Sequence, residues 1–492
     1  MKRIYILLIL IVLLGSFLRF FQLGDESFWA DEGATGMTIK KYTAMQILDN
    51  VKKYGQILPD YYYSDDDLPL YYMLMRGWTS IFGISDYSLR SFSAFLGSMA
   101  LIVVFYLSKL LFDEKTALLT TFLSSVSLML IWYAQDARQY SYLFFLSLAS
   151  VIFLLKSLKE KKTIYVVLFI ITNAFIIFTH FTWVMFFIFE GLYALYFMYK
   201  EHSLKKKVNI KVIIAFLIIA LLYSTIIGRA FTSHTDTIKN YGRPDLNQIA
   251  RFGIQLSTWI YPTEPMAQKI YAFSFDFSFS EWILLLSVLF LSLILSTLFI
   301  FGVYISLKRD YKKESTTFLL FMFFIPLIFA LVLSYIHPIV TVFQIKQLIY
   351  IIPPFLMLAS VGCLRLKNRI VLISLLGLLI ISPIYAYYSN IDREQFKEAA
   401  DFLPKDELIM IHTKTTQAVF KYYYGEKPNA IGVANLEEVK QHIKDKDNFW
   451  FLFTFLRYSQ HGEEIKEFLN QDYRIMGTKH FFGIDLINYE KN

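Results

Sequence analysis

The sequence predicts a polytopic α-helical membrane protein of about eleven transmembrane helices, followed by a C-terminal extracytoplasmic α/β domain. Three observations predict this fold class. Hydrophobic residues form 56% of the 492 residues and charged residues only 18%, whereas soluble domains carry about 25% charged residues. Apolar runs long enough to cross a bilayer recur from the N-terminus to residue 388. Residues 389–492 are about twice as rich in charge, which predicts a water-soluble domain.

Each predicted span contains close to the ~20 apolar residues that a helix needs to cross the hydrocarbon. The runs lie near 4–23, 90–110, 116–134, 141–157, 163–179, 182–199, 212–229, 281–306, 316–336, 343–362 and 370–388. They predict a membrane domain over 1–388 and a soluble domain over 389–492. The first run has two interpretations, because Lys2 and Arg3 also resemble the start of a cleaved signal peptide. No small-x-small cleavage site follows, so we expect a retained helix.

Basic residues predict the orientation, since cytoplasmic loops are enriched in Lys and Arg. Every second connection is short and basic, as at 156–162 and 200–211. The N-terminus is therefore expected in the cytoplasm and, with an odd number of spans, residues 389–492 outside. The two long outer loops are then 24–89 and 230–280. The formal net charge of +8 arises outside 389–492, which carry −3, so it does not indicate a nucleic-acid partner.

Alternating polar and apolar segments predict the elements of the soluble domain. We expect helices over 392–403, 436–444 and 463–469. We expect strands over 408–412, 449–455, 473–476 and 481–489, with a further element over 416–424. The single cysteine, Cys363, excludes an internal disulfide framework and a Cys-rich metal site.

An acidic pair, Asp31 and Glu32, follows the first span directly and is preceded by Phe28 and Trp29. Near a low-dielectric surface the charged form of a carboxylate is disfavoured, which makes it a better base. This is the place where a base could meet a lipid-borne substrate. The alternative interpretation is that Asp31 caps a helix over 34–45.

Three cations lie at the predicted outer ends of spans, against the general charge bias. They are Arg90, Arg138 and Lys346. Neutralising an anion at the headgroup level explains them, and snorkelling to ordinary lipid phosphate is the alternative for each one alone. His180, at an outer turn, could hold a metal or contact a sugar, or be an ordinary interfacial histidine. Asp67 closes an acidic run at 65–67 that either coordinates a cation or forms a solvated turn.

Blocks in the order of this chain resemble those of membrane glycosyltransferases with the GT-C fold. They are Leu18–Glu32, Pro69–Ser91, Ile131–Tyr140, Thr179–Phe181, Lys346–Pro354 and Phe396–Ala400. The pattern is similar to glycosyltransferase family 39 and the rhizobial lipopolysaccharide galacturonic-acid transferase-like group, with the protein O-mannosyltransferases and the lipid A aminoarabinose transferase as relatives. Two positions depart from it. Asp67 stands where the family often has His, and Lys346 replaces an arginine, which loses the bidentate fork for phosphate.

The resemblance implies transfer of one sugar from a polyprenyl-phosphate donor to a hydroxyl acceptor on the outer face of the bilayer. The acceptor is a lipid, a protein or a wall glycan. Lipid phosphate is a good leaving group, so such a reaction needs no strong general acid. It needs a base for the acceptor hydroxyl and cations that stabilise the phosphate as its charge develops. We assign Asp31 as base and Glu32 as the group that orients it or the acceptor, and one displacement would invert the anomeric centre.

Further site residues are assigned on the same pattern. The candidate ligands of the donor phosphate are Lys346, Arg138 and Arg90. The secondary substrate contacts are His180, Asp136, Tyr140 and Asp67. A divalent metal is optional, with Glu32 and His180 as the residues that could hold it, and the sequence establishes no cofactor.

Three rival functions stay open. A lipid or sugar transporter would place ionisable residues near the middle of the membrane, whereas the charges here gather at the outer ends of spans. A non-catalytic protein that binds polyprenyl phosphate would not need the acidic pair. A ligase or polymerase would act on whole lipid-linked glycans instead of single sugars.

Overall fold

The computed structural model describes most of the chain in two compact units. The described residues are 2–54, 56–61, 68–180, 183–204, 209–232, 244–257, 278–308, 311–336, 343–389, 393–444, 446–454 and 460–492. The first unit comprises Met1–Phe21, Asp66–Tyr71 and Ser91–Asn390, and the second Gln22–Asp65, Tyr72–Arg90 and Ile391–Asn492. Much of the predicted outer loop 24–89 thus groups with the C-terminal segment. The predicted membrane boundary after residue 388 stays a prediction.

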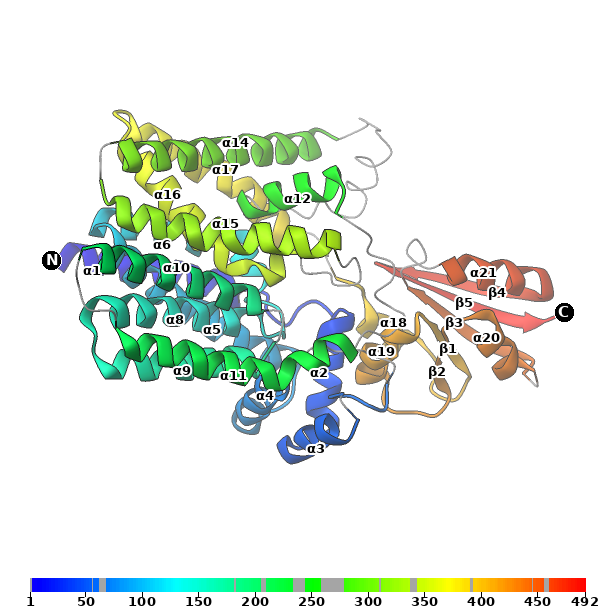
Figure 1. Cartoon of the computed structure of the whole chain (residues 1–492). Helices are drawn as coiled ribbons and strands as arrows, with labels where there is room; N and C mark the ends of the chain where they lie inside the picture. The colour runs from blue at the N-terminus through cyan, green and yellow to red at the C-terminus, as the bar shows by residue number, and fades with distance from the viewer. Residues whose placement is uncertain are drawn as a thin grey trace. The chain divides into compact units, whose positions relative to one another are not determined.

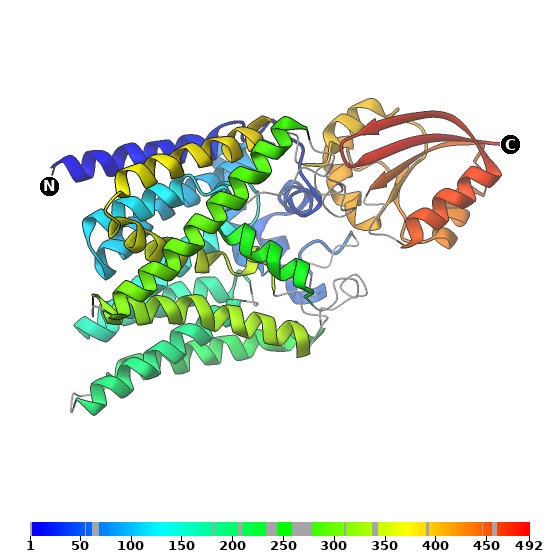
Figure 2. The ribbon, with the colours of Figure 1, turned by 90° about the horizontal axis from the view of Figure 1, so that it is seen from above.

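The first unit is a bundle of long helices (Figures 1 and 2). Its first half contains α1 (Lys2–Phe20), most of α5 (Asp86–Leu111), α6 (Glu114–Ser125), α7 (Leu128–Trp132), α8 (Tyr140–Glu160), α9 (Thr163–Ile177) and α10 (Val184–Ser203). Its second half contains α11 (Ile210–Thr232), α12 (Leu246–Ser257), α14 (Phe279–Lys308), α15 (Lys313–Ile336), α16 (Ile352–Leu364) and α17 (Arg369–Ser389). Six helices within the described residues are long and apolar enough to cross a membrane, and three shorter ones are also apolar. The architecture is that of a multi-pass membrane protein, while the count of eleven stays a prediction.

Two predicted spans are not continuous helices. The run 116–134 breaks between α6 and α7, where Val126 is the C-cap of the first helix and Ser127 the N-cap of the second. The run 343–362 starts as short 3₁₀ turns, η3 (Ile345–Gln347) and η4 (Ile349–Ile351), before α16 begins at Ile352. Pro353 and Pro354 occupy the first turn of α16, where proline is tolerated because the backbone N–H that it lacks would have no partner within the helix. The predicted outer loop 230–280 is described only at 230–232, 244–257 and 278–280.

Small residues and a buried arginine join helices in this bundle. A Cβ on Gly302 of α14 would overlap the backbone oxygen of Leu358 in α16, and one on Gly362 would overlap that of Leu298. Close backbone approach at small residues is a common way for membrane helices to pack. Arg19, 1% exposed, donates to the carbonyl oxygens of residues 15, 124 and 125. The Arg19 guanidinium is thereby held inside the bundle by backbone carbonyl oxygens.

The second unit contains a five-stranded mixed sheet of order β2-β1-β3-β5-β4. The strands are β1 (Ile409–His412), β2 (Ala430–Gly432), β3 (Asn448–Thr454), β4 (Tyr473–Phe481) and β5 (Ile484–Lys491). The helices of the C-terminal segment are α18 (Phe396–Phe402), α19 (Gln417–Tyr424), α20 (Leu436–Ile443) and α21 (Gln460–Asp472). α20 and α21 pack on β1, β3 and β5 through a shared apolar core that includes Val439, Leu469 and Phe451 (Figure 1). The predicted α/β character is confirmed, whereas the three-residue β2 was not predicted.

Three more helices come from the predicted outer loop 24–89. They are α2 (Ala30–Lys41), α3 (Ala44–Tyr54) and α4 (Pro69–Phe82), the last mostly in the second unit. α2 packs against α19, where a Cβ on Gly33 would overlap Val419. Only glycine allows this close approach. The acidic pair of the sequence therefore lies on a helix that is seated on the C-terminal α/β fold.

Candidate active site

Asp31 lies within the first turn of α2 and does not cap it. The helix begins at Ala30, its N-cap residue is Trp29, and no side chain caps it. The interpretation of Asp31 as the cap of a helix over 34–45 is therefore wrong, because the helix starts four residues earlier than expected. A carboxylate in the first turn is favoured by the positive end of the helix dipole. Asp31 is half-buried, and the next residue, Glu32, is fully buried.

Glu32 is bound by Arg90 in a two-pronged ion pair. Arg90 Nε donates to Glu32 Oε1 at 2.8 Å and Arg90 Nη2 to Oε2 at 2.7 Å. The remaining donors of Arg90 reach the carbonyl oxygens of Leu23 at 3.2 Å, Glu26 at 2.8 Å and Ser27 at 3.0 Å. All five N–H groups of this 2% exposed guanidinium are therefore engaged within the second unit. Arg90 holds the segment between α1 and α2 in place.

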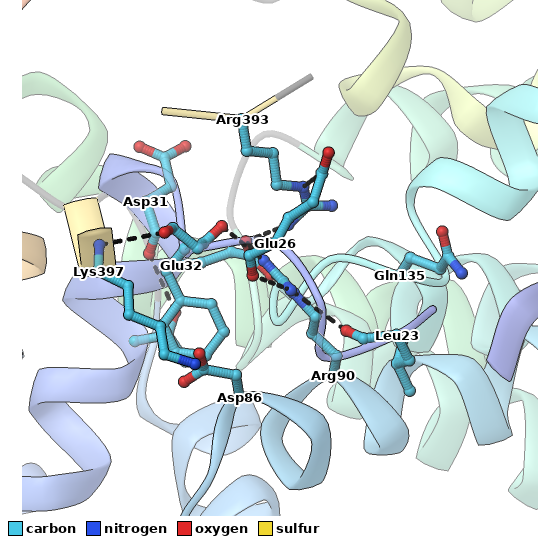
Figure 3. A network of polar contacts seen from close by, with 12 residues as sticks. Leu23, Glu26, Asp31, Glu32, Asp86, Arg90, Gln135, Arg393 and Lys397 are labelled. Carbon is cyan, nitrogen blue, oxygen red and sulfur yellow. Dashed lines mark hydrogen bonds and ion pairs between the residues drawn. The ribbon is translucent and has the colours of Figure 1, made fainter. Parts of the chain in front are cut away.

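A second arginine, Arg393, binds the same carboxylate from the C-terminal segment. Arg393 Nη1 donates to Glu32 Oε2, and Arg393 Nε lies 3.7 Å from Glu26 Oε2. Arg393 is 4% exposed. Figure 3 shows Glu32 directed toward these arginines, while the Asp31 carboxylate points away from Arg90. Sequence reasoning missed Arg393; a lone cation just after the last predicted span was its only signal.

Tyr423 of α19 connects the segment before α2 with the start of α5. Its hydroxyl accepts from the backbone N–H of Phe28 at 2.7 Å and donates to Asp86 Oδ2 at 3.0 Å. Burial raises the pKa of Tyr423 far above its ordinary value, so the hydroxyl keeps its proton. Ser27 Oγ donates to Glu398 Oε2 at 2.8 Å and accepts from the backbone N–H of Lys397 at 3.1 Å. The chain on the N-terminal side of the acidic pair is thus bonded to α18 and α19.

Other predicted residues gather within the first unit. Asp136 and Arg138 lie in the loop between α7 and α8, both buried, and Ser93 Oγ donates to the carbonyl of Arg138 at 3.0 Å. Tyr140 begins α8 and is 2% exposed. The half-buried Lys346 of η3 places its Nζ 5.8 Å from the centre of the Tyr140 ring. The structure therefore brings the start of α8 and the turn before α16 together.

His180 joins this group through a residue that the sequence did not indicate. Its Nε2 lies 3.5 Å from Nε2 of Gln347, the neighbour of Lys346. His180 is 3% exposed and follows α9. Tyr140, His180, Lys346 and Gln347 therefore lie close together around η3. Asp67, the remaining predicted substrate contact, lies outside the described residues.

A metal does not fit at Glu32. Both carboxylate oxygens already accept from arginine, which would compete with a cation for them. The described ranges contain no group of three or more His, Cys, Asp or Glu residues that could hold an ion. We therefore derive no step through a metal.

Comparison with known proteins places this geometry in context. The sequence pattern of the dolichyl-phosphate-mannose-protein mannosyltransferase family matches residues 66–227. The structure of ArnT from Cupriavidus metallidurans bound to undecaprenyl phosphate covers 98% of this chain and 97% of its own, with a TM-score of 0.56 and 11% identity. The chain has the GT-C fold. The predicted resemblance to GT-C, mannosyltransferase-like and ArnT-related proteins is confirmed.

Oligosaccharyltransferases share the same GT-C fold. AglB from Archaeoglobus fulgidus, in complex with an inhibitory peptide and a dolichol-phosphate, covers 99% of this chain and 74% of its own, with a TM-score of 0.55 and 13% identity. A structure of the Archaeoglobus fulgidus enzyme with Zn and sulfate gives a TM-score of 0.54 at 13% identity, covering 99% and 73%. Comparison with curated protein sequences gives no significant match. At these identities the similarity concerns the fold.

Proposed function

We propose that this GT-C protein transfers a single sugar from a polyprenyl-phosphate donor to a hydroxyl acceptor at the outer face of the membrane, with inversion. The observation that carries the proposal is the contrast within the acidic pair. Glu32 is buried between two arginines, while its neighbour Asp31 is half-buried and points away from Arg90 (Figure 3). A carboxylate neutralised by two guanidinium groups is a poor base. Asp31 is the one that we assign to the acceptor.

In the proposed reaction the acceptor oxygen attacks the anomeric carbon as its proton passes to Asp31. The bond between that carbon and the phosphate oxygen breaks, and the electron pair leaves with polyprenyl phosphate. Charge then develops on the phosphate, which a preorganised cation stabilises. Lys346 and Arg138 are our candidates for this role. The neighbours with bound undecaprenyl phosphate and dolichol-phosphate support a lipid phosphate as donor.

Arg90 is not used as a phosphate ligand in this proposal. Its five N–H groups are taken by Glu32 and three carbonyl oxygens, so contact with a phosphate would cost it one of these bonds. His180, Asp136 and Tyr140 are retained as secondary contacts. The proposal also keeps eleven spans, a cytoplasmic N-terminus and an outer C-terminal domain, because the basic loops predict that orientation.

The test is transfer by the purified protein from a panel of sugar-charged polyprenyl phosphates. Native mass spectrometry identifies which donor binds. Asp31→Asn should abolish turnover while donor binding persists, because the change removes only the proton acceptor. The matched control is Asp49→Asn on the exposed face of α3, which should turn over normally. Near-normal turnover of Asp31→Asn would exclude Asp31 as the base.

One observation favours a transporter as second candidate. Glu190 of α10 is fully buried and accepts from Ser150 Oγ of α8 at 2.6 Å, and Asn173 Nδ2 of α9 donates to Ser150 Oγ at 2.8 Å. Ionisable groups inside a membrane bundle often mark transport pathways, although helix–helix hydrogen bonding also explains them. Flux of lipid-linked sugar across proteoliposomes, abolished in Glu190→Gln, would support transport. Absence of flux alongside sugar transfer would exclude it.

A further inference from the structure

We infer that Arg393 is a positioning residue, through which the C-terminal α/β domain sets the direction of Asp31. The inference rests on the proposed function, because it assigns a purpose to geometry around the proposed base. Glu32 lies next to Asp31 in the first turn of α2, and its Oε2 is shared by Arg90 and Arg393. Arg90 lies near the start of α5, directly after its first turn, and Arg393 precedes α18. The two arginines therefore fix this turn from separate elements.

Contacts at both ends of α2 show how thoroughly the C-terminal segment holds it. At the start, the backbone N–H of Phe28 donates to the Tyr423 hydroxyl. At the end, Lys40 Nζ donates to the carbonyl of Tyr422 at 3.0 Å, and Lys41 Nζ pairs with Glu426 at 3.0 Å. These bonds lie on either side of the glycine contact with α19. The helix can neither rotate nor slide without breaking several of them.

The buried ion pair between Glu32 and the arginines is not needed merely to attach α2 to the C-terminal segment. Apolar packing of α2 on α19 already joins the segments, and buried ion pairs contribute little net stability against apolar side chains of the same shape. A forked arginine does, however, fix direction as well as distance. Reacting groups need placement to within about 0.5 Å. Orientation of the turn that carries Asp31 is therefore the function that explains Arg393.

The test separates turnover from donor binding in the full-length protein. Arg393→Met should lower kcat by about 10- to 100-fold, the scale of a 1 Å misplacement, with donor binding by native mass spectrometry unchanged. Arg393→Lys keeps the charge without the fork and should recover part of the loss. Arg474→Met, on the edge strand β4 and exposed, is the matched control and should retain wild-type kcat. An unchanged kcat in Arg393→Met would overturn the inference.

A double substitution tests the route through Glu32. If Arg393 acts through this carboxylate, adding Arg393→Met to Glu32→Gln should lower kcat no further, because the two residues act as one unit. Fully multiplicative losses would overturn the route. If the Arg393→Met protein cannot be produced in folded form, Tyr423→Phe is the alternative variant, because it removes the hydroxyl that accepts from the backbone N–H of Phe28. Tyr423→Phe should lower kcat and retain donor binding. A wild-type kcat in this variant would count against the inference. Turnover in Asp31→Asn instead contradicts the proposed base, so the two failures are distinguishable.

Discussion

Adjacent carboxylates in this protein have opposite surroundings. Glu32 is fully buried and satisfied by arginine, whereas Asp31 is half-buried on the next position of the same helical turn. Environment decides the role of such pairs, since burial and charged partners set how readily each carboxylate takes a proton. A sequence of two acidic residues could not tell which one is fully buried between two arginines and which one is half-buried. Arg90 shows the same limit, because a cation at the predicted outer end of a span resembles a phosphate ligand until its five N–H groups are seen to be engaged.

At the residue scale, Lys346→Ala is expected to weaken binding of the donor phosphate. Hydrogen bonds to charged groups contribute about 1.5–3 kcal/mol, so the dissociation constant should rise by about 10- to 100-fold. Titration of polyprenyl phosphate by native mass spectrometry measures this. Lys52→Ala, at an exposed residue of α3, is the control and should bind normally. Equal binding by both variants would remove Lys346 from the phosphate site.

Among the elements, the packing of α2 on α19 depends on one small residue. Gly33 meets Val419 of α19 with no room for a side chain, so α2 approaches this helix more closely than any other residue type would allow. The glycine is unremarkable in the sequence because its partner lies nearly four hundred residues away. Only the folded chain reveals why the acidic pair is followed by Gly33.

Gly33→Ala should therefore destabilise the protein by about 1–3 kcal/mol, the usual cost of forcing extra atoms into a packed contact. Thermal unfolding of the purified protein measures the change. Gly77→Ala within α4 is the control, because nothing lies within 4 Å of the added Cβ and alanine is favoured over glycine in helices by roughly 0.5–1 kcal/mol. The two substitutions should shift the unfolding temperature in opposite directions. A stable Gly33→Ala protein would contradict the close approach.

For the whole molecule, the boundary predicted from hydropathy differs from the division into compact units. The apolar runs end near residue 388, but residues 22–65 and 72–90 form one compact unit with residues 391–492. Contacts such as Glu32 with Arg393 join these segments across 361 positions. Hydropathy predicts where the chain enters the membrane, but it does not show which of the segments between the apolar runs fold together.

Orientation belongs to the same scale and can be tested by cysteine labelling. Glu467 is an exposed residue of α21, and Glu467→Cys should react with a membrane-impermeant maleimide on intact cells, because the C-terminal domain is predicted outside. Lys159→Cys, exposed at the end of α8, should react only after permeabilisation. The native Cys363 is buried and should give a low background. Labelling of Lys159→Cys on intact cells would reverse the predicted orientation.

Sequence alone predicted the membrane character and the α/β character of the C-terminal segment, and it singled out the acidic pair as a candidate site. Each of these follows from local composition, since hydrophobic free energy and backbone preferences act within short segments. Most of the described elements of 396–491 lie close to their predicted ranges. The sequence did not predict β2 or the break between α6 and α7, because a three-residue strand and a single break in a helix leave no periodic signal.

Tertiary structure decided everything that depends on partners distant in sequence. It alone showed that Arg90 and Arg393 share Glu32, that Gln347 lies beside His180, and that α2 is seated on α19. The physical reason is that an ion pair or a close helix contact requires two groups at one place in space. Neither group carries a mark of its partner in the chain, so the arrangement of the site emerges only when the chain has folded.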